Sequence, residues 1–136
     1  MDKNYQTQIQ AISCSLKGHS FSFVYSRTKP TQREADWIHQ VTMDSNYILG
    51  DLNLDPNVPD ERNKISTISG QNKTTILDES TTNTKIQLDH ILGVKRNDIT
   101  YYTTSFTNFV SDHKAITLRI SLSGAGFVKD QRLKIH

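Results

Sequence analysis

Cysteine is almost absent from this sequence, since Cys14 is the only one among 136 residues. An intramolecular disulfide is therefore excluded, and a single thiol is typical of a reducing compartment. The sequence also has no apolar run near the length of a membrane-spanning helix, and its N-terminus has no apolar signal segment. We therefore expect an intracellular protein, nuclear or cytoplasmic, with no membrane partner.

Proline and glycine are also scarce, and neither positive nor negative charge is in large excess. Three prolines and six glycines exclude collagen-like and low-complexity classes. Sixteen basic residues against fourteen acidic ones give a net charge of +2, which does not by itself indicate a nucleic-acid binder. An apolar content of 35% over 136 residues is that of one globular domain, or of part of a larger one.

The N-terminal third predicts a β-hairpin. Residues 7–16 alternate as a strand does, Lys17-Gly18 is a turn, and a second strand follows with Phe21 and Phe23 on one face. We expect both phenylalanines in a core. Tyr25 closes this strand, and its hydroxyl is expected near a phosphate-binding position.

A helix is predicted next, from Thr31 to about Asp44. Thr31 and Glu34 form a capping box, in which each side chain satisfies a backbone donor near the other residue. Ala35, Ile38 and Val41 recur at helical spacing and are expected to pack on a sheet. A strand over 46–50 follows, so the order strand, helix, strand predicts a right-handed crossover in an α/β sheet.

The rest of the chain is less regular. We expect a polar loop over 54–62, then a short helix or irregular turn, and an exposed loop carrying Thr81 and Thr82. Further strands are predicted over 86–94, 99–106 and 115–122. The expected organisation is a partial domain over 1–123, followed by a frayed or linker-like tail over 124–136.

Asp51 and Asn53 stand directly after a short apolar strand, with Gly50 as the turning point. Because side chains alternate along an extended chain, we expect this acid and this amide to point to the same side. Open α/β sheets bind ligands at such strand ends. An EF-hand calcium loop starting at Asp51 is excluded, because Pro56 stands in place of the required glycine. A turn-forming role for Asp51 stays open.

Two further strands carry acids at or near their ends, Asp89 on the strand over 86–94 and Asp112-His113 just before the strand over 115–122. Carboxylates suit Mg²⁺, and an imidazole held by an acid can stabilise charge on a phosphoryl oxygen. This set of residues predicts metal-assisted phosphodiester hydrolysis. Asp89 as a structural acid, and Asp112-His113 as a simple turn, remain alternatives. His90 has apolar neighbours and is interpreted as a core histidine.

Three motifs in order carry a resemblance to a known family. They are Gly-Asp-Leu-Asn at 50–53, Gln-Leu-Asp-His-Ile at 87–91 and Ser-Asp-His-Lys-Ala-Ile at 111–116. The chain thereby resembles the C-terminal half of the endonuclease/exonuclease/phosphatase (DNase I-like) family, and its motif residues are most similar to those of mobile-element (retroelement) endonucleases. The resemblance implies a two-sheet α/β sandwich truncated to its C-terminal half, Mg²⁺ or Mn²⁺ as cofactor, and nucleic acid, chiefly DNA, as partner.

The resemblance also implies a role for each motif residue. Asp51 would position or activate the attacking water, and Asn53 would bind the scissile phosphate. Asp112 would belong to the metal site, His113 would stabilise the phosphoryl transition state, and Asp89 would orient His113. Tyr25 corresponds to a family strand whose aromatic hydroxyl touches phosphate, which adds a substrate-binding residue.

The chain departs from the family pattern in one respect. In the family, the N-terminal half of the domain supplies an Asn and the principal metal-binding Glu, and we find no counterpart of this Glu here. The only glutamates here are Glu34, Glu61 and Glu79, and none follows an apolar strand. We therefore expect the chain alone to be weak or inactive, and to depend on a missing N-terminal half or on a homodimer. A phosphoinositide-type phosphatase, or a non-catalytic remnant that acts only as a binding module, are the alternatives.

Overall fold

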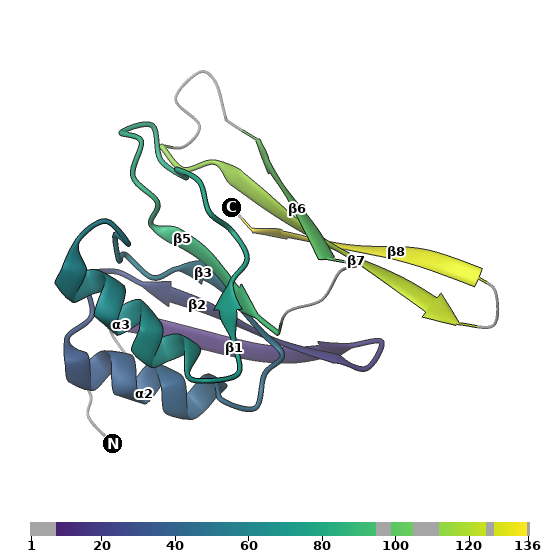
Figure 1. The fold of residues 1–136 in the computed structure, drawn as a ribbon, viewed down its shortest axis with the longest axis horizontal. Coiled ribbons are helices and arrows are strands. Elements are labelled where there is room, and N and C mark those ends of the chain that lie inside the picture. Colours follow the sequence, from purple (N-terminus) through teal and green to yellow (C-terminus); the bar gives the residue numbers. More distant parts are fainter. Residues whose placement is uncertain (1–7, 95–98, 105–111, 125–126, 136) are drawn as a thin grey trace. The chain divides into compact units, whose positions relative to one another are not determined.

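The computed structural model describes residues 8–94, 99–104, 112–124 and 127–135 (Figure 1). The chain divides into two compact units. The first comprises Met1–Ser80 and Gln87–Lys95, and the second comprises Thr81–Ile86 and Arg96–His136. Strands and helices are mixed, which confirms the α/β class.

The first unit contains a sheet and two helices. Its elements are β1 (Ile9–Leu16), β2 (His19–Ser26), α2 (Gln32–Thr42), β3 (Tyr47–Asp51), α3 (Pro59–Ser69), β4 (Thr74–Thr75) and β5 (Asp89–Gly93). The strand order is β1-β2-β3-β5-β4. β2 and β3 are parallel with α2 between them in sequence, as expected for a crossover, and the other strand pairs are antiparallel.

The hairpin and the first helix follow the local sequence signals. β1 pairs with β2 around the turn at Lys17-Gly18, and both hydrogen bonds of the capping box between Thr31 and Glu34 are present. The prediction for Val41 is wrong, because this side chain is 44% exposed. Its position lies on the outer edge of the apolar stripe, beyond Ile38, which is fully buried.

Two segments differ from the sequence prediction in their boundaries. α3 begins at Pro59, inside the stretch that was expected to be a loop, because proline is well suited to the first helical position. β5 begins only at Asp89, although the apolar pattern predicted a strand from Ile86.

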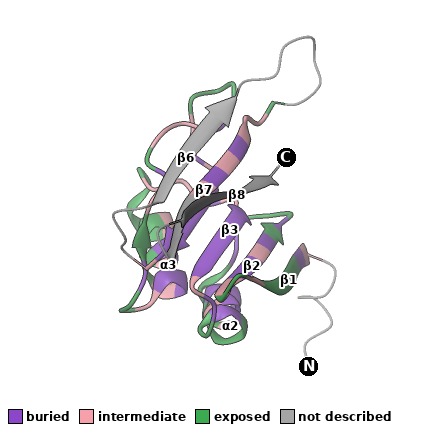
Figure 2. Ribbon diagram, turned by 90° about the vertical axis from the view of Figure 1, so that its right-hand side faces the viewer, coloured by how far each residue is buried: buried purple, intermediate pink, exposed green. Residues whose placement is uncertain are grey.

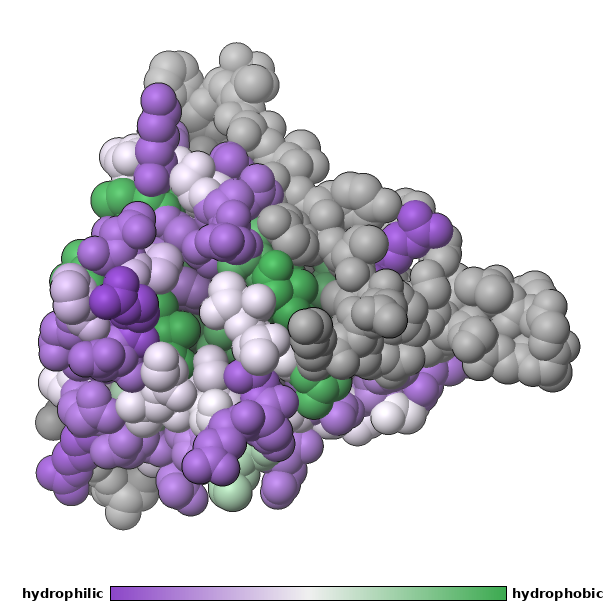
Figure 3. Space-filling model, in the orientation of Figure 1, coloured by the Kyte–Doolittle hydropathy of each residue, from purple (hydrophilic) through white to green (hydrophobic). Residues whose placement is uncertain are grey.

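The core of the first unit lies between one face of its sheet and the two helices, which lie side by side (Figure 1). β3 is buried along most of its length, whereas β1 is mostly exposed (Figure 2). Hydrophilic side chains predominate over the outer face of the helices (Figure 3). Among the described residues, no helix is both long and apolar enough to cross a bilayer. The core residues are Ile9, Val24, Ala35, Ile38, Ile48, Leu52, Leu54, Ile65, Ile68 and Leu92.

Gly50 of β3 lies directly against the backbone of Val24 on β2. Its φ angle is +137°, a conformation that residues with a Cβ atom rarely adopt. A Cβ atom here would also collide with the backbone carbonyl of Val24. Only glycine therefore allows β3 to continue in register to Asp51.

His90 is a satisfied core histidine, as the sequence indicated. It is 1% exposed, and its Nε2 lies 2.8 Å from the carbonyl oxygen of Leu54. Because a carbonyl only accepts, Nε2 carries the proton. Burial lowers the pKa of His90 below its ordinary 6.5, although the Leu54 carbonyl and the carboxylates of Asp89 and Asp55 act in the opposite direction. The ring is therefore neutral at pH 7.

The second unit contains an antiparallel sheet of β6 (Ile99–Thr104), β7 (Ala115–Gly124) and β8 (Phe127–Ile135), in that order. β8 lies in the stretch that the sequence pattern placed in a frayed tail, and it pairs with β7 over its whole length. Thr81 and Thr82 are buried, so the prediction that they are exposed is wrong.

Replacing Gly50 with alanine is expected to lower the free energy of unfolding by about 3 kcal/mol, because backbone strain and a backbone collision act together. Gly18→Ala is the matched control, since Gly18 also has a positive φ but no atom within 4 Å of a Cβ. Its loss should be about 1 kcal/mol. Urea denaturation measures both, and equal losses would contradict the close approach at Gly50.

The pH dependence of stability provides a second prediction. Below about pH 6.5 the unfolded chain protonates the histidine that the folded chain keeps neutral, so the free energy of unfolding falls with acidification. His90→Gln keeps a donor for the Leu54 carbonyl and removes the titration. The decline between about pH 7 and pH 5 should therefore be shallower in the variant. Identical pH slopes for the two proteins would show that His90 does not titrate as described.

Candidate functional site

Asp51 and Asp89 are direct cross-strand partners. Asp51 is the last residue of β3, Asp89 is the first residue of β5, and the antiparallel register places them opposite each other. Opposed residues in such a pair point to the same face of a sheet. A carboxylate oxygen of one lies within 4.8 Å of a carboxylate oxygen of the other. Asp89 is buried and Asp51 is half-buried.

This pair of acids fits a divalent cation. Two ionised carboxylates so close together repel each other, and burial strengthens the repulsion, so a nearby cation or a shared proton is favoured. Mg²⁺ and Mn²⁺ prefer oxygen ligands of this kind. The residues present at the end of β3 and β5 therefore suit the metal that the sequence resemblance implies.

Asn53 is placed differently from the sequence argument. Its φ angle is +56°, so the chain leaves the extended conformation after Asp51 and the alternation rule does not apply. A turn replaces it, in which the backbone N–H of Asn53 donates to Oδ1 of Asp51 at 2.9 Å. Asp51 is thus both a turn-former and a member of the acid pair.

The amide of Asn53 is held by the neighbouring strand connection. Its Nδ2 donates one hydrogen bond to the backbone carbonyl of Arg27, at 3.1 Å. An amide nitrogen carries two hydrogens, so a second donor remains for an anion. Arg27 itself is exposed.

Lys29 and Glu61 form an ion pair beside the turn that contains Asn53. The sequence did not predict a role for either residue. Lys29 Nζ lies 2.7 Å from Oε1 of Glu61 and 3.4 Å from the backbone oxygen of Asn53. The same Oε1 accepts the backbone N–H of Asp55 at 3.0 Å. Burial alone would raise the pKa of Glu61, but the hydrogen bonds from Lys29 and Asp55 outweigh it, so the pKa is lowered. No local spacing signals an ion pair between residues 32 positions apart.

Tyr25 lies on β2, which is the neighbour of β3. Phe23 is paired with Leu49, so by alternation Tyr25 shares the face of the sheet that carries Leu49 and Asp51. Tyr25 is 50% exposed, so this residue is in contact with solvent.

Asp112 and His113 belong to the second unit, where backbone hydrogen bonds hold them. The N–H of Asn83 donates to the carbonyl of Asp112 at 2.8 Å, and Thr82 forms a single β-bridge with His113. The N–H of Lys114 then donates to the carbonyl of Thr81 at 2.7 Å. Asp112 is exposed and His113 is half-buried. These backbone hydrogen bonds fix the segment just before β7, so it is more than a loose turn.

Comparison with known proteins gives information on the fold of the chain. No protein-family model and no curated protein sequence matches the chain. The solved structure of CdtB, the biologically active subunit of cytolethal distending toxin, is similar with a TM-score of 0.54 at 15% sequence identity, over 78% of this chain and 49% of that one. A crystal structure of beta toxin 275-280 from Staphylococcus aureus matches with a TM-score of 0.49 at 11% identity, over 93% and 56% of the two chains. This chain therefore spans about half the length of CdtB, and the likeness to CdtB shows a DNase I-like fold.

Proposed function

We propose that this chain carries part of the active site of a metal-dependent phosphodiester hydrolase, a nucleic-acid endonuclease of the mobile-element type. The observation that supports this most directly is the register pair of Asp51 and Asp89, with carboxylate oxygens within 4.8 Å of each other at the end of two central strands. Three motifs in family order, on a DNase I-like fold, agree with it.

Each residue has a role in this proposal. Asp51 positions the attacking water and takes up its proton, since a half-buried carboxylate at the end of a strand can reach both solvent and substrate. Asn53 donates its remaining amide hydrogen to the scissile phosphate, and Tyr25 contacts the same or a neighbouring phosphate. These three residues come from neighbouring parts of the first unit.

The second unit supplies the other half of the chemistry in this proposal. Asp112 adds a carboxylate ligand for Mg²⁺ or Mn²⁺, and the bound cation would neutralise charge on the phosphate and acidify a bound water. His113 donates a proton to a phosphoryl oxygen as charge develops there. Asp89 holds the imidazole in the productive orientation, as an acid beside a catalytic histidine does.

Turnover by the chain alone is expected to be slow. The side chains of Glu34 and Glu61 are both engaged in structural hydrogen bonds, so neither is available as the principal metal ligand of the family. The third glutamate, Glu79, does not follow an apolar strand as that ligand does in the family. The proposal therefore includes a further ligand from an additional segment or a second copy.

Plasmid nicking with Mg²⁺ or Mn²⁺ is the direct assay of activity. We expect slow conversion of supercoiled to open-circular DNA that stops on chelation. Asp51→Asn and His113→Ala should each reduce the rate by about 100-fold, as loss of a catalytic acid–base group does. Asp60→Asn is the matched control, because Asp60 is an exposed acid on α3 outside the proposed site.

Two results would count against the proposal. Nicking at the same rate in the His113→Ala protein would assign the activity to another site or to a contaminant. Turnover of an inositol phosphate in place of DNA would move the substrate to the phosphatase class. Rapid nicking by the chain alone would contradict only the expected dependence on a further ligand.

A further inference from the structure

Asn53 has a left-handed backbone conformation, with a φ angle of +56°. Asparagine adopts this conformation more readily than most residues, but it persists only where neighbouring groups hold it. The hydrogen bond from its N–H to Asp51 holds one side of the turn. The carbonyl side is held from outside the turn, by Lys29 and, through Lys29, by Glu61.

Lys29 lies in the connection between β2 and α2 and reaches across to the turn. Its Nζ lies 3.4 Å from the backbone oxygen of Asn53 and 2.7 Å from Oε1 of Glu61. A lysine side chain has many rotamers, so a hydrogen bond from it to an exposed carbonyl is easily lost. The short contact with Glu61 restricts these rotamers and keeps the ammonium at the Asn53 carbonyl.

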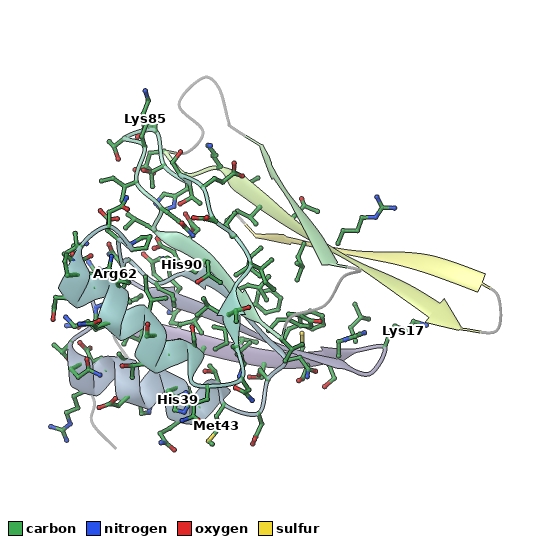
Figure 4. The ribbon with its side chains drawn as sticks, viewed as in Figure 1. Lys17, His39, Met43, Arg62, Lys85 and His90 are labelled. Carbon is green, nitrogen blue, oxygen red and sulfur yellow. The ribbon has the colours of Figure 1, made fainter. Side chains whose placement is uncertain are left out.

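Glu61 is the more firmly held member of the pair. Its side chain is 13% exposed, against 55% for that of Lys29. It lies in the first turn of α3, where the helix dipole favours a negative charge, and it precedes Arg62, which is labelled in Figure 4. α3 is itself packed into the core through Ile65 and Ile68. Burial alone would raise the pKa of the Glu61 carboxyl, but the hydrogen bond from Lys29 lowers it, so the group is ionised at neutral pH.

The same carboxylate also holds the backbone beyond Asn53. Oε1 of Glu61 accepts the N–H of Asp55 at 3.0 Å. Between these residues, the carbonyl oxygen of Leu54 lies 2.8 Å from Nε2 of His90, which is also labelled in Figure 4. Three consecutive residues are thus each bound by a side chain from a different part of the first unit. The direction of the Asn53 amide therefore depends on contacts beyond its own turn.

A second ion pair on the same helix provides a contrast. Lys64 Nζ lies 3.0 Å from Oδ2 of Asp60, and the side chain of Asp60 is 78% exposed. Among the residues that the structure describes, neither of these side chains hydrogen-bonds to the turn that contains Asn53. Partly exposed ion pairs contribute little to stability. What distinguishes the pair of Lys29 and Glu61 is therefore the turn that it contacts.

We propose that Lys29 and Glu61 are positioning residues for Asn53, which hold its side-chain amide where the scissile phosphate would bind. Their role rests on the proposed hydrolase, because the direction of this amide matters only if it meets a phosphate. Neither residue touches the phosphate or transfers a proton. Their loss would remove a hydrogen bond that strengthens as charge develops on the phosphate, while the rest of the site would still bind the substrate.

Nuclear magnetic relaxation tests the positioning without any turnover. Lys29→Met keeps most of the aliphatic stem and removes the ammonium. The order parameter of the Asn53 side-chain amide should fall from about 0.85 to below about 0.6 in this variant. Lys64→Met is the matched control, since it breaks the other ion pair of α3, and it should leave this amide unchanged. No fall in the Lys29→Met protein, or an equal fall in the control, would overturn the proposal.

Plasmid nicking adds a test in which charge and positioning predict opposite results. Lys29→Met removes a positive charge and Glu61→Gln removes a negative one, so electrostatic attraction of DNA alone would change the rate in opposite directions. Positioning predicts that both variants lower kcat by about tenfold, as loss of one hydrogen bond in the transition state does, with KM changed by less than about twofold. The double variant should be no slower than either single variant, because the two residues act as one unit. Lys29→Arg, which keeps the charge, should restore most of the rate.

Unchanged urea midpoints would show that the slow variants are folded. Opposite effects of Lys29→Met and Glu61→Gln on the rate would overturn the proposal, and so would a tenfold fall in the Lys64→Met protein. An absence of nicking by the wild-type chain would contradict the proposed hydrolase. The order parameters of Asn53 would then still decide whether Lys29 and Glu61 position its amide.

Discussion

The antiparallel register between β3 and β5 is the constraint on which the candidate site depends. It places Asp51 opposite Asp89, and a shift by one residue would send one of the two carboxylates to the helix face. Gly50 permits this register, because it lets β3 pass directly against the backbone of Val24. The apolar residues on the helix face then fix it, since Ile48 and Leu92 are opposed within the core. The apolar packing of the two strands thus holds the two acids next to each other.

The same strand pairing separates two chemical environments. On one face of the sheet the acids have a negative field that favours a cation. On the other face, the neutral His90 and the buried Gln87 border a polar cavity. Alternation along β5 is sufficient to explain the separation, because Asp89 and His90 are adjacent in sequence.

Features that depend on local sequence were predicted well. The capping box of α2, the hairpin turn and the core position of His90 rest on short-range chemistry or periodicity, and all three are present. α3 was missed at its start because Pro59 was interpreted as a loop residue, although proline also begins helices. The motifs predicted that Asp51 and Asp89 are close to each other, and they are cross-strand partners. The left-handed turn at Asn53 was not predicted, since nothing in the spacing reveals it. The ion pair of Lys29 and Glu61 needs the tertiary fold and could not be predicted.

Titration with substoichiometric Mn²⁺, followed by nuclear magnetic resonance, is the most direct measurement of the central claim. Paramagnetic broadening falls off steeply with distance from the ion, so it reports which side chains surround it. The account predicts that the signals of Asp51 and Asp89 broaden first and together, and that Asp51→Asn weakens the effect. Broadening of only one of these two signals, or broadening that begins at exposed acids such as Asp60, would contradict a metal site at this pair.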